Sequence, residues 1–85
     1  MDVIHMLFEG LVARFDANPK LVTQLEYNQM LDFIFKVYDK GNEALCEKLM
    51  HAAIDRYGDS VVDDVIERAT IMTEAQIAHA IIQLN

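Results

Sequence analysis

Three side chains that could ligate a metal ion recur at a regular spacing in the middle of the chain. Glu47, His51 and Asp55 are each four residues apart, which places them on one face of a helix. Carboxylate and imidazole groups bind zinc, but such a set needs further ligands from other elements, and Lys48 shares this face. We therefore expect a solvated, salt-bridging surface here, and the sequence predicts no metal and no cofactor.

A serine that follows an aspartate opens an acidic helical stretch at Gly58-Asp59-Ser60-Val61. This stretch resembles the serine motif of acyl and peptidyl carrier proteins, in which the serine bears a phosphopantetheine arm. The resemblance covers four residues and implies Ser60 as the modified residue. Serine is also a preferred N-cap of helices, so we expect Ser60 to be an ordinary cap and keep a carrier-like domain as an alternative.

The remaining reactive groups form no catalytic set. The chain has no glycine-rich phosphate loop and no nucleophile with a base at a readable spacing, so we predict that it is not an enzyme. The single Cys46 excludes an internal disulfide and is expected to be a small buried hydrophobe. No apolar run approaches the roughly 20 residues that span a bilayer, and no basic leader is present, which predicts a cytoplasmic protein.

Charge narrows the classes of partner. Fourteen acidic and seven basic residues give a net charge of -7, and the basic residues are not clustered, which argues against direct binding of nucleic acid or of a membrane surface. The densest negative patch is expected to be either solubilising or a docking site for a basic partner. Its residues are Asp55, Asp59, Asp63, Asp64 and Glu67, of which the last four are the candidate binding residues. A mimic of nucleic acid that occupies a basic cleft is a second alternative.

The apolar periodicity predicts an all-α protein with a single domain over residues 1–85. We expect a compact bundle of about five helices, at residues 2–17, 24–40, 43–57, 60–71 and 74–84. Pro19, Gly41 and Gly58 mark boundaries, and Asn42 is expected to cap the third helix. The spacing of Thr23 and Glu26 is typical of a capping box, which would start the second helix at residue 24 after a short turn over residues 19–22. The alternative is one helix that begins at Pro19.

The helix over residues 24–40 is predicted to be central, because its apolar residues fill an arc of roughly 200°, more than one neighbour can cover. These residues are Tyr27, Met30, Leu31, Phe33, Ile34, Phe35, Val37 and Tyr38. Residues of the fourth helix are expected to face the same core, among them Val61, Val62, Val65 and Ile66. In the first helix, the apolar residues that follow the helical period include Val3, Leu7, Phe8 and Phe15.

The last predicted helix is more apolar than an edge helix requires, with an apolar arc of about 220°. We therefore expect residues 74–84, through Ile77, Ile81 and Leu84, to form a homodimer or partner interface, either alone or together with exposed parts of the first helix. Together these features predict a small acidic protein-interaction module that binds another protein. Adaptors and inhibitors belong to this class, including those by which a phage or mobile element blocks a host machine.

Overall fold

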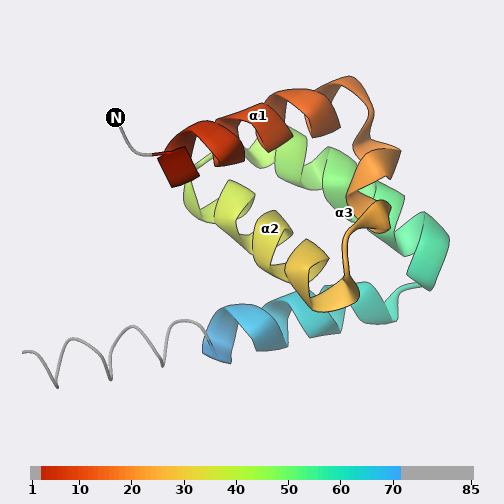
Figure 1. Ribbon diagram of the computed structural model, residues 1–85. Helices are drawn as coiled ribbons and strands as arrows, with labels where there is room; N and C mark the ends of the chain where they lie inside the picture. The colour runs from red at the N-terminus through yellow and green to blue at the C-terminus, as the bar shows by residue number, and fades with distance from the viewer. Residues whose placement is uncertain (1–2, 72–85) are drawn as a thin grey trace, which may run out of the picture.

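The computed structural model describes residues 3–71, and this part of the chain is helical except for short connections (Figure 1). Its elements are α1 (Val3–Ala17), the 3₁₀ helix η1 (Pro19–Gln24), α2 (Tyr27–Asp39), α3 (Glu43–Tyr57) and a further helix over residues 60–71. The predicted all-α bundle is confirmed. The helix predicted over residues 74–84 lies outside the described residues.

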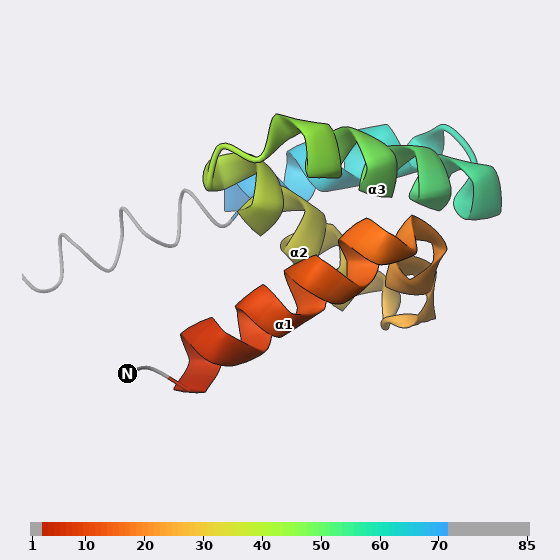
Figure 2. The same cartoon turned by 90° about the horizontal axis from the view of Figure 1, so that it is seen from above.

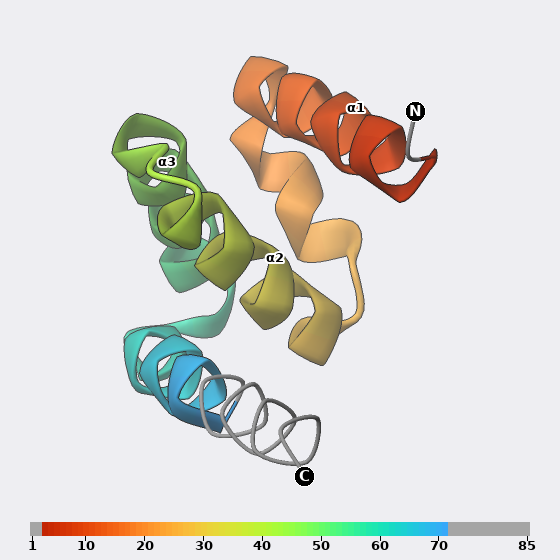
Figure 3. The ribbon, with the colours of Figure 1, turned by 90° about the vertical axis from the view of Figure 1, so that its left-hand side faces the viewer.

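Helix α2 is the centre of the arrangement, as the width of its apolar arc predicted. It lies between α1 on one side and the helix over residues 60–71 on the other (Figures 1 and 3). It supplies five of the twelve buried apolar residues found in the described chain, namely Met30, Leu31, Phe33, Ile34 and Val37. The other seven are Phe15, Val22, Leu45, Leu49, Ala52, Ala53 and Val61.

Helix α1 packs against this core mainly through its second half. The ring of Phe33 lies 5.2 Å from that of Phe8 and 5.1 Å from that of Phe15, the latter edge to face. The first turns of α1 run out past the other helices (Figure 2), and Val3 and Leu7 are 66% and 65% exposed. These two residues follow the helical period of the apolar side, but the core elements do not extend far enough to cover them.

The start of α2 also differs from the prediction. Pro19 begins η1, and the Thr23 hydroxyl donates to the Lys20 carbonyl at 2.8 Å within this 3₁₀ segment. The predicted capping box does not form, because Leu25 is extended and Glu26, the N-cap of α2, makes no side-chain capping bond. The helix consequently begins at Tyr27, three residues later than predicted.

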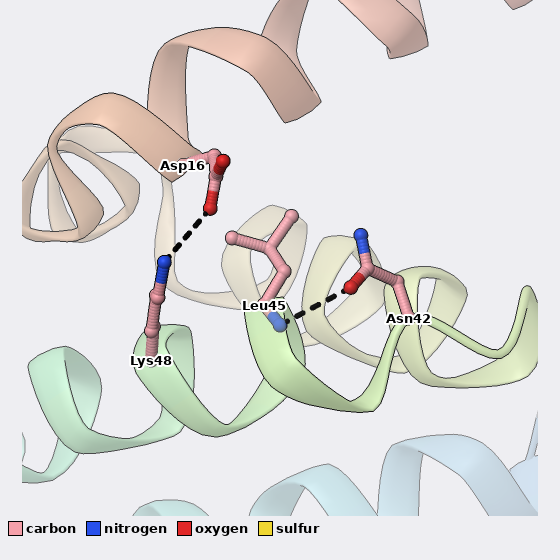
Figure 4. Close-up of polar contacts among 4 residues, drawn as sticks. All are labelled: Asp16, Asn42, Leu45 and Lys48. Carbon is pink, nitrogen blue, oxygen red and sulfur yellow. Dashed lines mark hydrogen bonds and ion pairs between the residues drawn. The ribbon is translucent and has the colours of Figure 1, made fainter.

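The start of α3 follows the prediction. Gly41 takes a φ of 86°, and the Asn42 side chain accepts a hydrogen bond from the Leu45 amide at 3.2 Å (Figure 4). One turn further on, Lys48 Nζ lies 3.0 Å from Asp16 Oδ1 and joins α3 to α1 (Figure 4). Both charges of this pair are exposed, so we expect it to add less than about 1 kcal/mol to stability.

Candidate interaction groove

The helix over residues 60–71 is placed by a sharp change of direction at Gly58. This glycine ends α3 with φ 90° and ψ 179°, while its amide still donates to the Ile54 carbonyl. The chain then returns alongside α2 (Figure 1). Val61 is fully buried and Val65 half-buried, so the first turns of this helix are the part that closes the core.

Two polar contacts hold the same helix against α2. The Tyr27 hydroxyl donates to the Asp64 carboxylate. Arg68 donates from Nε at 2.6 Å and from Nη2 at 3.2 Å to the two carboxylate oxygens of Asp32. The hydrogen bond and charge of Asp32 raise the pKa of Arg68, which stays protonated. The helix is thus fixed to the first half of α2 by two side-chain contacts.

An apolar groove of about 320 Å³ opens beside this contact, between α2, α3 and the helix over residues 60–71. We refer to it as the groove, and its walls include Phe35, Tyr38, Cys46, Met50, Val62 and Ile66. Figure 3 looks toward the side of the molecule on which the three helices meet. Among the described residues that line the groove, none carries a formal charge at neutral pH. It is therefore suited to an apolar occupant.

Several groove residues were expected in the core. Tyr38 and Ile66 are each 60% exposed and Val62 is 38% exposed, so the prediction that they are buried is wrong. The helix over residues 60–71 turns Val61, Asp64 and Arg68 toward its neighbours, and the side of Val62 and Ile66 consequently faces the groove. The periodicity of the sequence predicted which residues form the apolar side of this helix. It did not predict how the helix is rotated about its own axis relative to its neighbours.

The groove holds one group of potential reactivity, the Cys46 thiol. It is half-buried, and its sulfur lies 3.9 Å from the Ile34 carbonyl oxygen. Burial, and secondarily the charge of Glu43, raises the pKa of this thiol. Because the thiolate is the nucleophilic form, a raised pKa keeps Cys46 unreactive at neutral pH. Cys46 therefore serves as an apolar wall residue, in line with the expected role but less completely buried.

The possible metal ligands on α3 are solvated. His51 Nε2 lies 3.7 Å from Glu47 Oε1 with both side chains about three-quarters exposed, and Asp55 is exposed as well. In residues 3–71, no three His, Cys, Asp or Glu side chains are grouped so that they could hold a metal ion. This face of α3 therefore carries a weak, solvated pair of Glu47 and His51, as expected for a salt-bridging surface.

The acidic residues predicted to bind a partner are divided. Asp59, Asp63 and Glu67 are exposed, whereas Asp64 is half-buried and accepts the Tyr27 hydroxyl. Ser60, the alternative modification site, is exposed at the first residue of its helix. The remaining predicted binding residues, Ile77, Ile81 and Leu84, lie outside the described residues.

Sequence reasoning did not identify the groove, although one signal pointed to it. The apolar arc of α2 was wider than one neighbour could cover, and the part of it that the packed helices leave open includes Phe35 and Tyr38, which form one wall. The residues of the opposite wall and of α3 come to lie beside this wall only because three helices pack at particular angles. A pattern within one helix does not contain these angles.

Comparison with known proteins adds no family to this geometry. No protein-family model, no curated protein and no solved structure matches the chain. In the described part of the chain, no helix combines the length and the apolarity that crossing a bilayer requires. The features of this chain that bear on its function are therefore the groove and the surfaces beside it.

The contact between Tyr27 and Asp64 provides a pH-dependent test of how the groove wall is held. This hydrogen bond, with partial burial and the Asp64 charge, raises the pKa of Tyr27 from 10.0 to about 12. The folded state holds the tyrosine proton more tightly than the unfolded state. The resulting stability is therefore fully present below about pH 10 and is lost as the pH rises toward about 12.

We expect Tyr27→Phe to lower the free energy of unfolding by about 1.5 kcal/mol at pH 8, the lower end for a hydrogen bond to a charged group. The difference from the wild type should shrink as the pH rises above 10 and vanish near 12. Urea unfolding followed by circular dichroism measures the free energy of unfolding of the wild type and of the variant at each pH. Cys46 is present in both proteins, so its contribution cancels in the difference between them. A difference that stays constant across this range would contradict the proposed bond.

Proposed function

We propose that this chain is a cytoplasmic, non-enzymatic interaction module that binds another protein in the groove. The observation that supports this most directly is the exposure of Tyr38 and Ile66, 60% each, on opposite walls of an uncharged hollow. Contiguous apolar surface of this kind is unfavourable in water unless something covers it, and on soluble proteins it typically marks a binding site.

The shape and composition of the groove favour a helix as the bound element. An amphipathic helix inserts apolar residues spaced three, four or seven positions apart into such a hollow. Met50 and Cys46 provide a polarizable, adaptable surface, and Tyr38 provides a large contact area with little loss of conformational freedom. The groove therefore offers both an anchor and a surface that adjusts to it.

The acidic side chains extend this surface. Asp63 and Glu67 follow Val62 and Ile66 in the sequence, so they project about 100° further round the same exposed helix. Negative charge at the rim of an apolar site accelerates association with a partner that has basic flanks. A module of this kind would act as an adaptor or as an inhibitor. As an inhibitor it would bind a helix through which another protein complex makes its own contacts, including a host complex targeted by a phage or mobile element.

Affinity capture with three forms of the protein tests this function. The wild type is compared with Ile66→Asp, which places a charge in the groove, and with Leu7→Asp, which makes the same kind of change at a similarly exposed residue, 65% against 60%. We expect the Ile66 variant to lose at least about tenfold in recovery of a partner, since a buried unpaired charge costs several kcal/mol. The Leu7 variant should retain the partner.

Recovery that is equal for all three forms would contradict binding through the groove. Recovery lost only in the Leu7 variant would instead place the site on the exposed start of α1. Far-ultraviolet circular dichroism of each variant shows whether its helices are intact, so that a loss of binding is assigned to the surface rather than to unfolding.

A further inference from the structure

The electrostatics of the groove restrict what the molecule can place there. The chain carries a net charge of -7, so two copies repel one another wherever their charged faces meet. The groove is an exception, because its described lining is uncharged and apolar. A second copy could therefore contact this surface at least electrostatic cost, provided that the inserted segment is itself neutral.

The longest segment of the sequence without acidic, lysine or arginine residues meets this condition. Residues 75–84 include no acidic and no basic residue apart from His79, which is neutral at pH 7. They lie outside the described residues, and their sequence predicts a helix. Ile77, Ile81 and Leu84 follow one another at positions i, i+4 and i+7, which is the anchor spacing of helices that bind in apolar grooves.

The connection to this segment favours a second copy over the chain's own groove. The helix over residues 60–71 forms one wall of the groove, so the same chain could fill it only by reversing direction directly after residue 71. Tight reversals between helices usually use glycine or proline, and the chain contains neither residue after Gly58.

We propose that residues 75–84 of one copy occupy the groove of a second copy, and that the exchange is reciprocal. A two-fold dimer then fills both grooves, leaves no groove open for a further copy and closes the assembly at two chains. This proposal rests on the groove being a binding surface, as argued under the proposed function, and it assigns the occupant of the groove when no other partner is bound: a second copy of this chain, through Ile77, Ile81 and Leu84.

Sedimentation of complementary variants tests the exchange. Ile66→Asp damages the groove but keeps the segment, whereas Ile81→Asp damages the segment but keeps the groove. The full-length wild type and the Leu7→Asp control are expected at twice 9.7 kDa, and each of the two variants alone at 9.7 kDa, between about 1 and 100 µM. Tyr38→Asp, on the opposite wall, should repeat the result of the Ile66 variant.

Mixing the Ile66 and Ile81 variants gives the decisive measurement. Each mixed pair retains one intact groove and one intact segment that fits it, so a species of twice 9.7 kDa should reappear. Its dissociation constant should be at least about tenfold larger than that of the wild type, because only one of two contacts forms. Circular dichroism and the midpoint of thermal unfolding verify that every variant is folded.

Three outcomes would overturn the exchange: a wild type that stays at 9.7 kDa throughout, a mixture that fails to associate, or a dimer that persists in the Ile81 variant. If the wild type is a single chain but partner capture still depends on Ile66, the proposed function stands and only the assignment of the occupant fails. If capture is also independent of Ile66, both proposals fail.

Discussion

Replacing Phe33 with alanine is expected to lower the free energy of unfolding by about 3 to 5 kcal/mol, the usual cost of removing a buried aromatic side chain. Phe33 is 7% exposed and stands between Phe8 and Phe15, with both ring centroids within 5.2 Å. Its loss leaves a cavity and removes both aromatic contacts that connect α1 to α2. Small domains are stable by only about 5 to 15 kcal/mol, so this single change is severe.

Phe35→Ala is the matched comparison for this prediction. It removes the same side chain two residues along the same helix, but Phe35 is half-buried and lines the groove, so we expect a loss of about 1 to 2 kcal/mol. Urea unfolding followed by circular dichroism gives both values, and Phe33→Leu supplies a milder change if the alanine variant is largely unfolded. Equal losses at the two positions would contradict the assigned burial.

The contrast between these two phenylalanines shows what the sequence could and could not predict. Both belong to the apolar arc of α2, and the width of that arc correctly identified the central helix. Which phenylalanine is buried depends on where α1 and the helix over residues 60–71 lie, and periodicity within α2 does not specify this. The same reason explains why Tyr38, Val62 and Ile66 were expected in the core but line the groove.

Helix boundaries were predicted well wherever a local residue determines them. Asn42 and Gly58 set the limits of α3 at the predicted residues 43 and 57, because capping and a positive φ depend on only a few neighbouring atoms. The start of α2 was missed because the Thr23 hydroxyl had two available partners, and it bonds within η1 rather than to the start of the next helix.

The candidate site was less predictable than the fold, again for a physical reason. Exposed acidic residues are visible in a sequence as charge, so Asp59, Asp63 and Glu67 could be proposed directly. The groove requires side chains from three helices, and Cys46 and Met50 join Phe35 only after α3 packs across α2. A surface built by packing angles has no signature in a single stretch of residues.

Gly58→Ala is expected to destabilise the protein by about 1 to 3 kcal/mol, the cost of holding a non-glycine residue in a region of backbone space that essentially only glycine occupies. Gly58 has φ 90° and ψ 179°. A Cβ added there meets no atom within 4 Å, so this cost arises from the backbone alone.

Gly10→Ala is the control of opposite sign. Gly10 lies exposed within α1, and an added Cβ there also meets no atom within 4 Å, so alanine should stabilise the helix by about 0.5 to 1 kcal/mol. Urea unfolding should therefore show that the same glycine-to-alanine substitution lowers the free energy of unfolding at residue 58 and raises it at residue 10. Stabilisation by Gly58→Ala would mean that the turn relaxes without cost. The groove would then owe its shape to the contacts of Tyr27 and Arg68 rather than to the turn that precedes them.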